Sequence, residues 1–86
     1  MGGDTLDFGD YDGVLVGRIA KRADQEIRVG LKEYKGTQFI DIRTYFLVSG
    51  GWRPSGRGIT IPPEAYPELA GVTVELGRAL GLDAAE

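Results

Sequence analysis

Cationic and aromatic side chains are interleaved through the middle of the sequence. In a protein that holds single-stranded nucleic acid, cations neutralise the phosphates and aromatic rings stack on the bases, with about 1–3 kcal/mol per stacked base. The cationic members are Arg28, Lys32, Lys35, Arg43, Arg53 and Arg57, and the aromatic members are Tyr34, Phe46 and Trp52. This combination predicts a surface for single-stranded nucleic acid, with core packing as the alternative for each strand aromatic.

The charge of the chain is segregated along its length. Residues 17–58 hold nine cations and four anions, whereas the remaining residues carry a charge of −8, and the whole chain has a net charge of −3. A basic centre between acidic ends is typical of a face that binds a polyanion. The alternative is a solvated sheet face on which lysines and arginines are merely scattered.

Several of these residues have a second interpretation. Arg43 and Asp41 share a side of one predicted strand, so an ion pair competes with a phosphate contact, which we favour for Arg43. Arg53 and Arg57 lie in a glycine-rich segment that is either a clamp for a phosphate backbone or a flexible connection. Phe46 is equally suited to stacking and to the core.

The residue types exclude several classes of chemistry. The chain has no cysteine and no histidine, which removes disulfides, the usual zinc and haem ligands, and Cys–His or Ser–His nucleophiles. The segment Gly51–Gly58 lacks the Lys-Ser/Thr ending of a nucleotide-binding loop. We therefore expect no enzyme and no metal or other cofactor. No apolar run is long enough to span a membrane, so no membrane partner is expected either.

Four segments have the character of strands. They are Tyr11–Lys21, Gln25–Tyr34, Thr37–Val48 and a fourth that includes Gly58–Ile61. The second alternates apolar and polar residues at period two, which is the clearest local signal in the sequence. Lys35-Gly36 predicts a tight hairpin turn, and Trp52–Arg57 predicts a loop before the fourth strand.

A single helix is predicted after the strands. Pro62-Pro63-Glu64 is typical of a helix start, and Gly81-Leu82 is typical of a C-terminal cap. One apolar face is formed by Leu69, Val72, Leu76, Ala79 and Leu80. Pro67 predicts that the helix either kinks or restarts there.

The expected architecture is an α+β fold with the order β-β-β-β-α, in one domain over residues 11–86 after a flexible acidic tail over residues 1–10. One helix can cover only one face of the sheet, so the other is expected to stay open and to carry Arg28, Lys32 and Tyr34. A chain of 86 residues is marginal as a monomer, and without disulfides or metals we expect oligomerisation to supply the missing stability.

The stretch Leu31–Phe46 (LKEYKGTQFIDIRTYF), followed by Pro54–Ile61 and Pro63-Glu64, resembles the core of the transcriptional coactivator positive cofactor four family. The specific parts are the aromatic-Lys-Gly turn, the Ile-Asp-Ile-Arg strand, and a Pro-x-x-basic-Gly-Ile hairpin ahead of a Pro-Glu helix. They cover roughly residues 14–70. The resemblance implies a curved antiparallel sheet, a homodimer packed through the helices, and sheet-lined channels for single-stranded DNA.

Carried over by position, the resemblance gives each site residue a role. Tyr34 and Phe46 take the places of stacking aromatics, with Trp52 in support. Backbone-contacting positions are occupied by Lys35, Arg43, Arg53 and Arg57. Thr37 and Gly56 stand where the family carries basic residues, and Phe46 stands for a larger tryptophan, which implies weaker binding.

The resemblance points to a small stand-alone, prokaryotic member that acts in transcription regulation or in protecting single-stranded DNA, with transcription machinery as a further partner. Such a protein is expected in the cytoplasm, associated with the nucleoid; a eukaryotic member would be nuclear. Two alternatives remain open: an RNA-binding or RNA-remodelling module, and a protein-interaction domain with a basic face.

Overall fold

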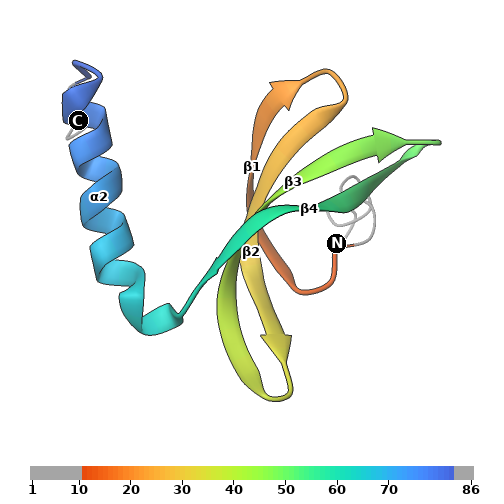
Figure 1. Cartoon of the computed structure of the whole chain (residues 1–86), viewed down its shortest axis with the longest axis horizontal. Coiled ribbons are helices and arrows are strands. Elements are labelled where there is room, and N and C mark those ends of the chain that lie inside the picture. Colours follow the sequence, from red (N-terminus) through yellow and green to blue (C-terminus); the bar gives the residue numbers. More distant parts are fainter. Residues whose placement is uncertain (1–10, 83–86) are drawn as a thin grey trace, which may run out of the picture.

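The computed structural model describes residues 11–82 and contains a four-stranded antiparallel sheet followed by helix (Figure 1). The elements are β1 (Val14–Arg22), β2 (Gln25–Tyr34), β3 (Thr37–Val48), β4 (Gly51–Ile61), the short 3-10 helix η1 (Pro63–Ala65) and α2 (Tyr66–Ala79). The strands are neighbours in chain order, β1-β2-β3-β4, and the sheet is strongly twisted (Figure 1). This arrangement confirms the predicted β-β-β-β-α order. The expected tail, residues 1–10, lies outside the described residues, as do residues 83–86.

Two-residue turns close the second and third hairpins. Lys35 and Gly36 have φ values of 53° and 81°, and Ser49 and Gly50 have φ values of 45° and 80°. Two consecutive residues with positive φ are the mark of a type I′ turn, whose twist matches that of the flanking strands. The Lys35-Gly36 turn was predicted, and it places both residues at the tip of a long β2–β3 hairpin.

The prediction of a loop at Trp52–Arg57 is wrong. β4 begins at Gly51, immediately after the Ser49-Gly50 turn, and Trp52 pairs with Leu47. Residues 55–57 of β4 stand opposite the single residue Thr44 of β3. The segment that was expected to be a loop is therefore a bulge inside the strand. A proline is tolerated at position 54 because β4 is an edge strand.

Local residues define both ends of helix α2. Pro67 lies in its first turn, so the chain restarts there after η1 and does not kink. At the other end Gly81 has a φ of 79°, its N–H donates to Arg78 O at 2.9 Å, and Leu82 N–H donates to Gly77 O at 2.8 Å. This pair of bonds is the Schellman arrangement that the Gly81-Leu82 sequence predicted.

The helix does not cover the sheet. In Figure 1, α2 stands to one side of the strands and is joined to them through η1. Its apolar residues Val72, Leu76 and Leu80 are 58%, 56% and 71% exposed. Among residues 11–82 the buried apolar side chains are those of Ile40 and Tyr45 alone. The expectation that the helix packs on one face of its own sheet is therefore wrong.

The two faces of the sheet differ in chemistry. Side chains that pair across strands lie on the same face, and successive residues alternate. We call the side with Glu26, Arg28, Asp41, Arg43 and Tyr45 the polar face and the opposite side the apolar face. The apolar face carries Ile19, Ile27, Val29, Ile42 and Ile59. Buried residues of the sheet lie mainly on the polar face, which is unusual because the carboxylates and guanidinium groups are the most deeply enclosed.

Within residues 11–82, no helix is long and apolar enough to cross a bilayer.

Candidate nucleic-acid interface

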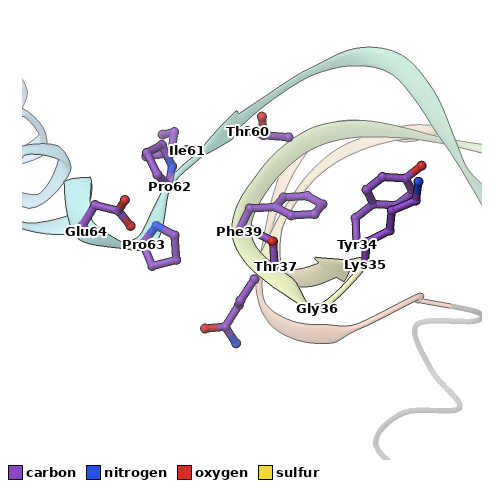
Figure 2. Close-up of a pocket in the computed structure, with 11 residues that line it drawn as sticks. Tyr34, Lys35, Gly36, Thr37, Phe39, Thr60, Ile61, Pro62, Pro63 and Glu64 are labelled. Atoms are coloured by element: carbon purple, nitrogen blue, oxygen red, sulfur yellow. The ribbon is translucent and has the colours of Figure 1, made fainter.

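An open groove lies at the tip of the β2–β3 hairpin (Figure 2). Residues 34–39 of the hairpin and residues 60–64 at the end of β4 and the start of η1 line it, and its volume is about 1000 Å³. Tyr34 is 67% exposed at its rim, and the Nζ of Lys35 lies 5.4 Å from the centre of the Tyr34 ring. The groove thus presents an accessible aromatic ring with a cation beside it.

The walls of this groove are largely apolar. Figure 2 shows the ring of Phe39 between Tyr34 and the Pro62-Pro63 pair, with Glu64 at the end away from Tyr34. Rings and prolines offer flat surfaces for a base, and the ammonium of Lys35 offers a contact for a phosphate. The sequence analysis identified Tyr34 and Lys35 as site residues but not Phe39 or Glu64. Cross-strand pairing of Lys32 with Phe39 is the feature that brings Phe39 beside the hairpin end.

A first ion-pair cluster on the polar face surrounds Glu26. Arg18 Nε donates to the two carboxylate oxygens of Glu26 at 2.9 and 3.1 Å, and Arg18 Nη2 donates at 2.8 Å. Arg28 Nε donates to Glu26 Oε2 at 2.5 Å. Burial by itself would raise the pKa of Glu26, but the hydrogen bonds from Arg18 and Arg28 outweigh it and hold the pKa below its usual value. Glu26 is therefore a fixed anion that orients both arginines.

A second cluster surrounds the buried Asp41. Arg43 Nη2 donates to Asp41 Oδ1 at 2.9 Å, and Lys32 Nζ lies 3.5 Å from Asp41 Oδ2. Arg43 Nη1 also donates to the carbonyl of Ser55 in the β4 bulge at 3.0 Å. The hydrogen bond to Asp41 raises the pKa of Arg43 above its usual value, so its charge is permanent. The ion pair between Arg43 and Asp41, which was the alternative to a phosphate contact, is present, and the phosphate contact favoured for Arg43 stays a prediction.

Tyr11 closes the polar face beside Lys32. Its ring is 5.0 Å from Lys32 Nζ and 6.0 Å from the ring of Tyr45. Burial raises the pKa of Tyr11 to about 12, so its hydroxyl stays protonated. A Cβ at position 30 would lie 2.3 Å from the Tyr11 hydroxyl, so glycine at position 30 makes room for this ring. Sequence reasoning missed Tyr11 and Arg18, and the β1–β2 register, which pairs Arg18 with Arg28, is the signal that places Arg18.

The open face expected for Arg28, Lys32 and Tyr34 is found only in part. The three share one side of β2, as predicted, and Tyr34 is exposed. Arg28 is fully buried, however, and the side chain of Lys32 is 17% exposed. The reason is the curvature of the sheet, which brings Tyr45 and Trp52 over Arg28, with ring centres 4.7 and 5.6 Å from its guanidinium carbon.

The remaining site residues are divided between the two faces. Phe46 pairs with Arg53, and both are on the apolar face, whereas Trp52 pairs with Leu47 on the polar face. Arg57 lines a smaller hollow with Ile42 and Ile59. Arg53 and Arg57 are exposed, while Phe46 is half-buried. The structure therefore groups Tyr34 with Lys35 and separates both from Phe46, Arg53 and Arg57.

Comparison with known families decides where the chain belongs. The family model described as Transcriptional Coactivator p15 (PC4) matches residues 21–72, which is more than half of the chain. The chain belongs to the PC4 family. No curated protein matches it.

Two crystal structures of a PC4 homologue from Burkholderia pseudomallei are similar to this PC4 chain. The orthorhombic form is 26% identical over 81% of this chain and 97% of that one, with a TM-score of 0.73. The tetragonal form is 25% identical over 77% of this chain and 98% of that one, with a TM-score of 0.70. The PC4 family match begins at Lys21 and ends at Val72, so it includes the hairpin tip, the β4 bulge and the first half of α2.

In this PC4 chain Glu26 is the group whose titration can be tested. Because the pKa of Glu26 is lowered in the folded protein, ionised Glu26 stabilises the fold at pH values above 4.5, the usual pKa of a glutamate. This stabilisation is lost as the pH falls through the pKa of Glu26 in the folded state. We expect Glu26→Gln to lower the free energy of unfolding at pH 7 by at least about 1 kcal/mol, because Arg18 and Arg28 lose a charged acceptor. Urea unfolding from pH 7 to pH 3 should show the difference between wild type and variant shrinking. A difference that is constant with pH would contradict the ionic role of Glu26.

Proposed function

We propose that this protein binds single-stranded DNA with little sequence preference, through base stacking and phosphate contacts. One observation carries the proposal: Tyr34 stands exposed beside Lys35 at the rim of a groove in a chain of the PC4 family. A core aromatic would be enclosed, whereas an exposed ring next to a cation is suited to an unstacked base and its phosphate. Family membership supports a DNA-binding role, and the proposed function is binding without catalysis.

The accessible aromatic and cationic side chains are proposed to contact bases and phosphates respectively. Tyr34 and Lys35 hold a base and a phosphate at the hairpin tip, and Phe46 with Arg53 and Arg57 forms a second, separate contact at the β4 side. The side chains of Lys32 and Arg43 are 17% and 22% exposed and lie on the polar face, opposite Phe46 and Arg53. Because Arg43 also neutralises the buried Asp41, the exposed Arg53 and Arg57 are the better choices for testing phosphate contacts.

We further propose that the protein is a homodimer that packs through α2. Val72, Leu76 and Leu80 follow one another at four-residue spacing and form an apolar stripe that no part of residues 11–82 covers. The described residues bury too little apolar surface for an independent fold of this size, and a second copy would supply the missing contact. A homodimer would also present two grooves to one strand of DNA.

In a prokaryotic cell, such a protein would act at the nucleoid, in transcription or in protecting unwound DNA.

The proposal is tested by the fluorescence anisotropy of a labelled single strand at several salt concentrations. If Lys35, Arg43, Arg53 and Arg57 each neutralise one phosphate, log K should fall against log salt with a slope of about −3 for a single strand. An unlabelled duplex of the same sequence should compete weakly. Equal competition by duplex would overturn the single-strand preference, and stronger competition by RNA of the same sequence would assign the surface to RNA.

A further inference from the structure

The polar face holds a row of arginines that runs straight across three strands. Arg18 pairs with Arg28 in the β1–β2 ladder, and Arg28 pairs with Arg43 in the β2–β3 ladder. Like charges directly opposite one another destabilise a sheet. The row ends at Gly58 in β4, where a Cβ would lie 2.8 Å from Arg43 Cζ, so a side chain there would crowd the guanidinium.

Each carboxylate of the polar face meets two cations. Among residues 11–82, Arg18 and Arg28 share Glu26, and Lys32 and Arg43 share Asp41. Arg28 is the fully buried cation of this set, and a buried charge is costly unless it is paired and its hydrogen bonds are complete.

Arg28 is the member whose hydrogen bonds are incomplete. Its Nε is bonded to Glu26, but Nη1 and Nη2 are buried and have no acceptor among residues 11–82. Buried donors of a charged group nearly always have partners, so this pair is an exception that calls for an explanation. Two neighbouring N–H groups in a fixed plane fit two oxygens of a phosphate.

The cover over Arg28 has a fixed side and a movable side. Tyr45, 1% exposed, lies at the centre of the cluster. Trp52 lies on the edge strand β4, one residue after its start and two before Pro54, and is partly exposed. Its ring centre is 5.6 Å from the guanidinium carbon, compared with 4.7 Å for Tyr45. Trp52 is therefore the side chain that can be moved without opening the core.

We propose that Arg28 is a covered phosphate site: a phosphate group displaces the Trp52 ring and takes the two free N–H groups of the guanidinium. The cation–π contact holds the site closed, and the phosphate supplies the acceptors that Arg28 Nη1 and Nη2 lack. The site goes beyond the proposed function, since it uses a residue that is inaccessible in the closed state, and it accepts any phosphate, whether free or in a nucleic-acid backbone.

The sole tryptophan of the chain is Trp52, so its fluorescence reports on the cover directly. We would titrate the wild type with pyrophosphate at constant ionic strength. The expected result is a saturable shift of the emission to longer wavelength, as the ring leaves the cluster for water. Absence of a saturable response would overturn the proposal.

Two variants make the assignment specific. Arg28→Met should weaken pyrophosphate binding at least about tenfold, because the bidentate contact is lost. Arg22→Met removes an exposed arginine of β1 and should leave the affinity unchanged. Equal weakening in both variants would mean nonspecific charge attraction, and unchanged binding in Arg28→Met would remove Arg28 from the site; either overturns the proposal.

Trp52→Ala supplies a second test that does not depend on the folding of Arg28→Met. Without the cover, pyrophosphate should bind several-fold more tightly in calorimetry, and equal or weaker binding would contradict the covering role of Trp52. Competition then separates the sources. If oligothymidylate displaces pyrophosphate, the site takes backbone phosphates; if oligothymidylate binds without displacing it, the site serves free phosphate compounds. Oligothymidylate that fails to bind while pyrophosphate binds would overturn the proposed function and leave this site standing.

Discussion

Replacing Leu76 with aspartate is expected to convert a dimer of this protein into monomers. Leu76 is 56% exposed at the middle of the apolar stripe of α2, between Val72 and Leu80. In a helix-to-helix dimer this position faces its counterpart in the partner, so two carboxylates would be buried together without cations. That cost exceeds what a small interface can offset. Sedimentation velocity at micromolar concentration measures the loss directly.

Val74 offers a matched control within the same helix. It is 45% exposed, and because it lies two residues from Leu76 it points to nearly the opposite side of α2. Val74→Asp introduces the same charge at a similar distance from the helix ends, and it should leave the dimer intact. A wild type that sediments as a monomer, or equal dissociation in both variants, would contradict the proposed role of the α2 stripe.

The second large effect is expected from Tyr34→Ala. A stacked base contributes about 1–3 kcal/mol, so single-strand affinity should fall by between about fivefold and 150-fold. The free energy of unfolding should change by less than about 0.5 kcal/mol, because Tyr34 is exposed at the hairpin tip and supports no core contact. Anisotropy with a labelled single strand and urea unfolding give the two quantities from one preparation.

Tyr66→Ala is the control for Tyr34→Ala. Tyr66 is an exposed tyrosine at the first position of α2, with 58% exposure against 67% for Tyr34, and it lies outside the groove lining. Its replacement should leave the affinity unchanged. A fold that is destabilised by Tyr34→Ala while its affinity stays the same would favour the alternative of a protein-interaction domain, in which the aromatics serve stability.

Local patterns were sufficient to predict most of the secondary structure. Alternation at period two identified β2, because one side of that strand meets water or polar groups and the other meets apolar neighbours. Lys35-Gly36 predicted its turn, since few residue pairs accept two positive φ values. Gly81-Leu82 predicted the end of α2 for the same kind of local reason. The segment Trp52–Arg57 was misread because glycine and proline suggest a loop, whereas an edge strand with a bulge also accepts them.

The sequence by itself determined the order of the elements, the basic centre of the chain, and the position of Lys35 beside Tyr34. Each of these features depends on residues that are neighbours along the chain. Only the tertiary structure decided which cationic side chains are exposed to solvent. The sheet curvature and the register across β1, β2 and β3 enclosed Arg28 between two rings and tied Arg43 to Asp41. It also left the α2 stripe uncovered. Burial depends on contacts between residues that are distant in the chain, and alternation along one strand carries no information about them.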